Sequence, residues 1–181
     1  MDDGETTSRM NTKVEGQDLL MERVFAAPRD LVFKAFSEQE RLAEWWGPEG
    51  WRTESRRFEF MPDGVWHYCM RCTDEAQGEF YGQESWGKAV YHKISAPEKI
   101  VYTDMFVNEE GQPVDGMPQI LVTVKLLDEE NKTRVTVRSH FTSDKALQQV
   151  LDMGVIEGFT SQFDRLAGYL HKSQEELLDY H

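Results

Sequence analysis

Apolar and polar residues alternate through most of the chain after its first seventeen residues, as in strands with one buried face. The turn signals between these runs have a physical basis. In Met61-Pro62-Asp63-Gly64, proline sets the first bend and glycine supplies a positive φ. The alternation predicts strands at 18–26, 53–60, 65–73, 79–94 with an interruption near Gly87, 99–107, 119–127 and 132–141.

Helical spacing replaces alternation in three places. Pro28 opens a predicted helix over 29–36, and a capping box formed by Ser37 and Glu40 predicts a second one through Trp45. A third helix is expected over 143–171, with Gly154, Gly158 and Gly168 in its interior. Each interior glycine costs roughly 1 kcal/mol relative to alanine, so these three indicate a close helix–sheet approach or open space beneath the helix.

The order of these elements favours one fold class. Helices segregated from a run of antiparallel strands are typical of α+β proteins. A helix of about 29 residues is about 43 Å long at 1.5 Å per residue, close to the length of the predicted strands. We therefore expect a helix-grip fold: a curved antiparallel sheet around one long C-terminal helix, with two short helices after the first strand.

The chain of 181 residues is long enough for one domain with short extensions. Its first seventeen residues are polar and mixed in charge. We expect a disordered lead-in over 1–17, a ligand-binding domain over 18–171 and a C-terminal tail over 172–181.

Composition excludes several classes of function. The net charge of −13 disfavours nucleic-acid binding, because an acidic surface repels phosphate. No apolar run approaches the length of a membrane span, and the N-terminus has no hydrophobic signal segment. Cys69 and Cys72 are three apart in a strand and should point to opposite faces, so we expect free thiols. These features together favour a cytoplasmic location.

Aromatic and polar side chains are candidates for a binding site. Trp66, Tyr68 and Met70 share one face of a predicted strand, and large aromatics with polar tips suit an apolar ligand that has a few hydrogen-bonding groups. An ordinary packed core is the alternative. No His/Asp/Glu set has metal-ligand spacing and no nucleophilic triad is evident, so we expect no metal, cofactor or catalytic residue. The predicted ligand-binding residues are Trp45, Trp46, Trp66, Tyr68, Met70, Trp86, Tyr102, Asp104, Val122, Val124, Met153 and Glu157.

Six segments, in order, resemble one known family. They are Arg23 to Pro28, Leu42 to Pro48, Asp63 to Trp66, Ile94 to Thr103, Thr133 to Thr136, and Gly158-Phe159 with the leucines after it. Together they resemble the heat-shock-protein-90 ATPase activator homologue-like family of the START-like, helix-grip superfamily, over roughly residues 20–170. Asp63, Ala96 and Phe159 depart from the family pattern, and the departures are structural.

The resemblance implies noncovalent binding of a small, largely apolar or aromatic molecule between the sheet and the long helix. Two alternatives stay open: a co-chaperone-like interaction domain acting on a heat-shock-protein-90-type ATPase, and an enzyme similar to polyketide cyclases or hydrolases. The expected partner is a small molecule, with no nucleic acid and no membrane, and a homodimer also stays open.

Overall fold

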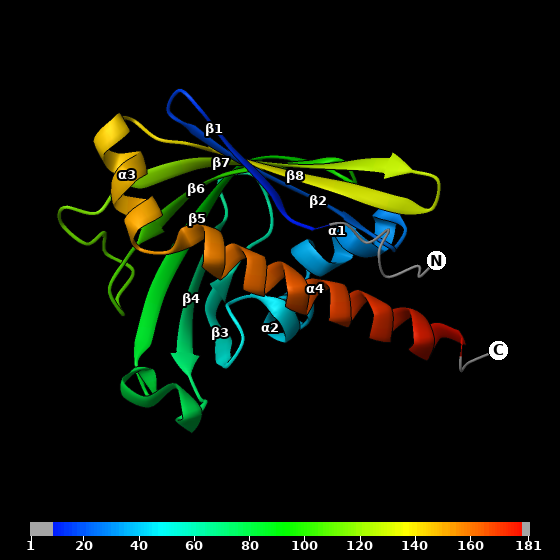
Figure 1. Cartoon of the computed structure of the whole chain (residues 1–181), viewed down its shortest axis with the longest axis horizontal. Helices are drawn as coiled ribbons and strands as arrows, with labels where there is room; N and C mark the ends of the chain where they lie inside the picture. The colour runs from blue at the N-terminus through cyan, green and yellow to red at the C-terminus, as the bar shows by residue number, and fades with distance from the viewer. Residues whose placement is uncertain (1–8, 179–181) are drawn as a thin grey trace.

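The computed structural model describes residues 9–178 and has the predicted α+β architecture (Figure 1). Its eight strands are β1 (Asn11–Glu15), β2 (Asp18–Phe25), β3 (Trp51–Phe58), β4 (Val65–Cys72), β5 (Glu84–Ser95), β6 (Lys99–Phe106), β7 (Gln119–Glu129) and β8 (Lys132–His140). Its helices are α1 (Arg29–Ser37), α2 (Gln39–Trp45), α3 (Asp144–Asp152) and α4 (Val155–Leu178), with the short 3-10 helix η2 (Glu75–Phe80) between β4 and β5.

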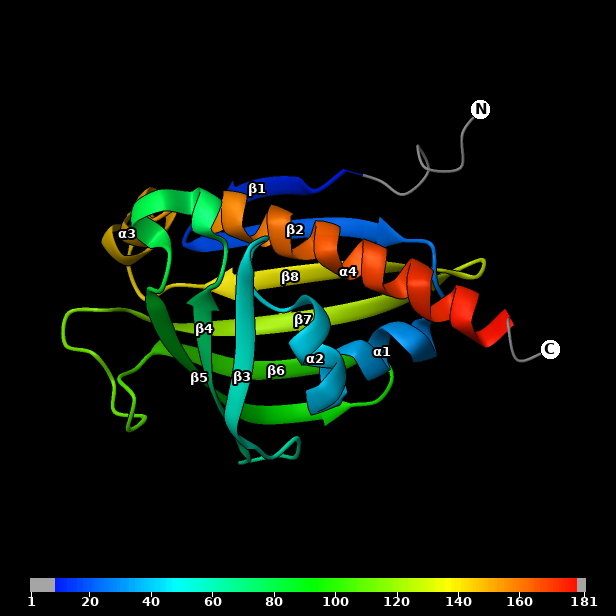
Figure 2. The same cartoon turned by 90° about the horizontal axis from the view of Figure 1, so that it is seen from below.

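The strands form one antiparallel sheet in the order β1-β2-β8-β7-β6-β5-β4-β3. In Figure 2, α1, α2 and α4 all lie over the same face of this curved sheet. The helix-grip fold is therefore confirmed, and the space between α4 and the concave face is where side chains from distant parts of the chain meet.

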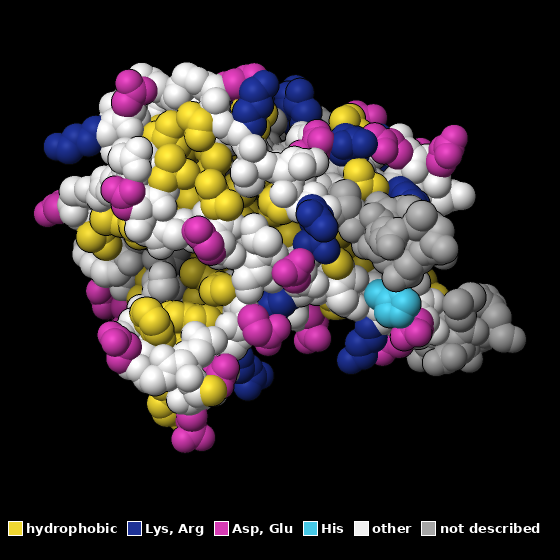
Figure 3. Space-filling model, in the orientation of Figure 1, with side chains coloured by type: hydrophobic (Ala, Val, Ile, Leu, Met, Phe, Trp, Pro, Cys, Tyr) yellow, Lys and Arg dark blue, Asp and Glu magenta, His cyan; other side chains and the backbone are white. Residues whose placement is uncertain are grey.

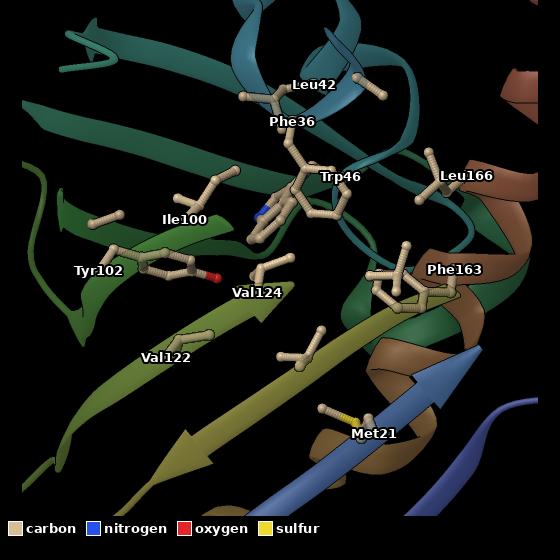
Figure 4. Close-up of a cluster of buried hydrophobic side chains, with 14 of the residues drawn as sticks. Met21, Phe36, Leu42, Trp46, Ile100, Tyr102, Val122, Val124, Phe163 and Leu166 are labelled. Atoms are coloured by element: carbon tan, nitrogen blue, oxygen red, sulfur yellow. The ribbon is translucent and has the colours of Figure 1, made fainter. Parts of the chain in front are cut away.

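The hydrophobic core fills that space. Figure 4 shows Phe36 and Leu42 from α1 and α2, Val124 from β7, and Phe163 and Leu166 from α4 pointing into one interior. The sheet contributes to this core through alternation, because every second residue of β7 and β8 is buried. Packing of this helix face, more than helix propensity, holds α4 in place.

Most predicted elements are confirmed, but four local predictions are wrong. Residues 11–15 form β1 instead of belonging to a disordered lead-in. Ser37 does not cap α2, because its hydroxyl bonds to the carbonyl of Lys34 and Glu38 occupies the N-cap position. The fourth predicted strand begins at Glu84 and is continuous through Gly87. The positive φ of the turn after β3 belongs to Asp63 (φ 66°), whereas Gly64 is needed because a Cβ there would lie 2.1 Å from the carbonyl oxygen of Glu59.

The predicted long helix is two helices. Gly154 has φ 87°, a left-handed conformation that stops α3 and lets the chain turn into α4. Gly158 and Gly168 do lie within α4, yet a Cβ at either position would meet no atom within 4 Å, so neither allows a close helix–sheet approach. The tail also begins later than predicted, because α4 continues to Leu178. Residues 1–8 of the predicted lead-in and 179–181 of the predicted tail lie outside the described residues.

Candidate functional site

A cluster of aromatic rings lies on the concave face where α2, β4 and α4 meet. The ring centroids of Trp46 and Trp66 are 4.9 Å apart, and those of Trp66 and Tyr68 are 4.3 Å apart. Phe159 of α4 reaches the same cluster, 6.5 Å from Trp46. Trp46 reaches this place because α2 ends at Trp45, and Trp66 and Tyr68 reach it because they alternate along β4.

The rings leave little room between them. The apolar cavity beside Trp46 and Trp66 has a volume of about 10 Å³, at the lower limit for holding one water molecule. It is lined by Phe36, Leu42, Trp46, Trp66, Ala89, Tyr91, Ile100 and Tyr102. Open space between the long helix and the sheet, one of the two explanations of the helix glycines, is therefore not confirmed at this place, and the aromatic cluster is closely packed.

Asp104 provides a carboxyl group on the same concave face. It lies opposite Ala89 of β5 and Ile120 of β7 in the sheet register, next to Tyr102 on its own strand. The surrounding protein raises the pKa of Asp104 to about 7, because burial penalises the charged form, and a backbone hydrogen bond from Met105 offsets only part of this. The residue as a whole is nevertheless only partly buried.

Asp104 should make stability pH-dependent. The folded protein holds this proton up to about pH 7, whereas the unfolded chain releases it near its ordinary pKa of 3.8, so stability falls as pH rises from about 4 to 7. At pH 8 the Asp104→Asn variant should be more stable than the wild type by on the order of 3 kcal/mol. Urea denaturation across pH measures the difference between the two proteins, and an equal difference at pH 4 and pH 8 would contradict the burial of this carboxyl.

Gly87 makes room for Tyr68. The two residues are cross-strand neighbours, and a Cβ at position 87 would lie 2.5 Å from both the Cζ and the hydroxyl oxygen of Tyr68. The hydroxyl end of the ring therefore lies over the backbone of β5 at Gly87. The same desolvated position raises the pKa of the Tyr68 hydroxyl well above its usual range. The glycine is visible in the sequence, but its partner across the sheet is not.

Gly87→Ala should displace the Tyr68 ring and destabilise the fold by about 1–3 kcal/mol, as overpacking of a core typically does. Chemical denaturation measures this change. In a Tyr68→Leu background the added methyl has space, so the same substitution should then cost clearly less. An equal cost in both backgrounds would mean that strand strain, and not the ring, is responsible.

The structure brings together most of the predicted ligand-binding residues. Those on or beside the concave-face cluster are Trp46, Trp66, Tyr68, Met70, Tyr102, Asp104, Val122 and Val124. Trp45 is completely buried beneath them, and its indole donates to the carbonyl of Ala35, so it supports the cluster from behind.

Three predicted residues lie elsewhere. Trp86 is on the convex face, in register with Cys69, where the guanidinium carbon of Arg56 lies 4.9 Å from its ring centroid. It lines a separate groove of about 570 Å³ with a mixed-charge wall. Met153 is 53% exposed at the end of α3, and Glu157 is exposed on α4. The prediction placed both residues on one continuous helix, and the break at Gly154 turns them away from the sheet.

Two polar residues of α4 that the sequence reading missed hold the loop after α2. Gln162 is buried, and its Oε1 accepts from the backbone N–H of Gly47 (2.8 Å). The guanidinium of Arg165 lies within hydrogen-bonding distance of the carbonyls of Gly47 (2.8 Å) and Trp51 (3.1 Å). Three further carbonyls, of Glu44, Trp46 and Pro48, lie within 3.3 Å. Trp46 belongs to this loop, so α4 fixes the position of the cluster.

Three further observations concern the cysteines, metal-binding groups and the helices. Cys69 and Cys72 are free thiols. Across residues 9–178, no group of three or more His, Cys, Asp and Glu side chains is arranged to hold a metal ion. None of the helices described is both long enough and apolar enough to cross a membrane.

Comparisons with known proteins agree with this architecture. The model of the family described as Activator of Hsp90 ATPase homolog 1-like protein matches residues 26–171. A solution structure of a protein from Arthrobacter aurescens is 28% identical, covers 92% of each chain and has a TM-score of 0.81. Protein Ms6760 from Mycobacterium smegmatis is 25% identical over 90% of this chain and 96% of its own, with a TM-score of 0.78. A comparison with functionally curated proteins gives no match.

Proposed function

Since this chain belongs to the Activator of Hsp90 ATPase homolog 1-like protein family, we propose that it binds a small, largely apolar or aromatic molecule between its sheet and α4. The START-like fold is compatible with ligand binding and with a co-chaperone-like role. One observation favours ligand binding: the carboxyl of Asp104, a partly exposed residue, lies among buried aromatic rings on the concave face. Apolar walls with a few polar groups are typical of small-molecule sites.

Because the aromatic cluster is closely packed, space for a ligand requires either movement of its rings or an opening at the end of the fold near α3. Figure 3 shows a hollow, rimmed by hydrophobic side chains, below the α3–α4 junction beside β5. Gly158 lies one turn before the buried Gln162 on the same side of α4, and nothing occupies the space around its Cβ position. We propose that a ligand enters from this end and that the aromatic rings move to admit it.

Titration of an environment-sensitive apolar dye tests the proposal. Saturable binding to the native protein is expected, with a change in tryptophan emission. Gly158→Leu should weaken binding at least tenfold, because its side chain occupies the space beside α4. Gly168→Leu is the matched control, because Gly168 is exposed in the same helix and gains the same helix propensity. Absence of saturable binding, or an equal effect of the two variants, would count against the proposal.

A second candidate is catalysis of proton transfer on the bound molecule. The pKa of Asp104, about 7, is the value that suits a general acid or base at neutral pH. Mass spectrometry of candidate polyketide-like substrates after incubation would test this, with conversion by the wild type and none by Asp104→Asn as the supporting result.

A further inference from the structure

The Asp104 carboxyl has no cationic partner among the described residues. Strand neighbours Ala89 and Ile120 are apolar. The ionisable groups that interact with it are Tyr68 of β4, Tyr91 of β5 and Tyr102, and burial raises the pKa of each, so all three are neutral. Apart from the backbone hydrogen bond from Met105, a charged carboxylate in this position therefore has no compensating group.

A basic residue on the same face of the sheet, Arg23, is already paired with another carboxylate. Arg23 projects from β2 onto the same face of the sheet, but its Nη1 lies 2.7 Å from the carboxylate of Asp164 on α4. Glu157, the acid in the first turn of α4, is exposed and carries its charge into solvent. Arg23 therefore supplies no positive charge to Asp104, and a buried lone charge is costly unless a partner arrives.

The aromatic walls add a second attraction for a cation. Trp46, Trp66, Tyr68 and Tyr102 present ring surfaces within one cluster. A cation over the face of a tryptophan or tyrosine gains about 0.5–2 kcal/mol, more when it is removed from water. The net charge of −13 also raises the local concentration of cations over the whole surface.

We propose that the bound molecule is a hydrophobic amine, whose protonated nitrogen pairs with the Asp104 carboxylate while its apolar or aromatic body lies against the tryptophan and tyrosine rings. This inference rests on the proposed ligand-binding function and specifies the chemical class of its ligand. Binding is coupled to a proton, because the amine requires the ionised carboxylate.

Two nearly isosteric probes test this class directly. Naphthylmethylamine is a cation at neutral pH, and naphthylmethanol has the same ring and one neutral polar group in place of the ammonium. Calorimetric titration at about pH 8 should show the amine binding at least tenfold more tightly. Below about pH 6 this preference should fall by a similar factor as Asp104 takes up a proton.

Two variants assign the preference to one carboxylate. Asp104→Asn should remove the preference for the amine, by lowering the affinity for the amine far more than the affinity for the alcohol, with circular dichroism confirming the fold. Glu157→Gln removes an exposed acid and should keep the preference. Equal affinity of the two probes for the wild type, or a preference that survives in Asp104→Asn, would overturn the amine inference while the proposed function stands. Absence of binding by both probes would overturn both.

Discussion

Replacing Trp66 with alanine should lower the free energy of unfolding by about 3–5 kcal/mol, the usual cost of removing a large aromatic from a packed core. The side chain is 3% exposed and contacts the rings of Trp46, Phe58 and Tyr68. Its indole N–H also donates to the hydroxyl of Ser55 (2.8 Å). With a cavity of only about 10 Å³ beside it, the ring has neighbours on nearly all sides.

Chemical denaturation measures this loss, and Trp86→Ala provides the matched control. Trp86 is the same residue type on the convex face, partly exposed, so its removal should cost clearly less. If Trp66 instead bordered an open cavity, it would already lack contacts on one side and its removal would cost little. A loss below about 2 kcal/mol would indicate such a cavity and contradict the packing seen here.

Arg165→Met should destabilise the protein by about 3 kcal/mol, because several carbonyls of the loop after α2 then lose a charged donor. Methionine keeps much of the apolar stem, so packing changes little. The closest of these contacts, to the carbonyl of Gly47, is 2.8 Å. The same loop is held to α4 through Gln162 and Ser161, so the variant should weaken the loop without releasing it completely.

Unfolding by urea, together with tryptophan emission, checks the Arg165 prediction. Trp46 is next to the affected carbonyls, so its environment should become more polar before global unfolding. Arg165→Lys should recover only part of the loss, because an ammonium lacks the planar spread of a guanidinium. Lys172→Met is the control for removing a positive charge from an exposed position of α4. An equal effect of Arg165→Met and Lys172→Met would show that the carbonyl contacts contribute nothing.

Local sequence signals were sufficient for most of the fold. Alternation located β2, β4, β6, β7 and β8, because one buried face imposes a period of two wherever the strand lies. Pro28 located the start of α1 for an equally local reason, since its fixed φ suits a first turn. The helix break also had a local signal, because a glycine such as Gly154 often ends a helix. The prediction nevertheless placed Gly154 inside one continuous helix.

The site depended more on long-range pairing. The sequence could propose Tyr68 on β4, and Tyr102 and Asp104 on β6, because each lies on the inward-facing side of its own alternating strand. The contacts of Trp86 with Cys69 and Arg56 depend on how β5, β4 and β3 pair, and no residue near Trp86 in the sequence encodes them.

Sequence patterns therefore determined which residues form strands and which side of each strand is apolar, because those choices follow from local periodicity. The tertiary structure alone determined what each side chain meets. Tyr68 lies over Gly87 because two strands pair in one register, and Arg165 binds the carbonyls beside Trp46, 119 residues away, because α4 crosses the concave face. The packing around Asp104 depends on all of these contacts at once, so the sequence could not decide between an open space and the closely packed aromatic cluster that the structure has.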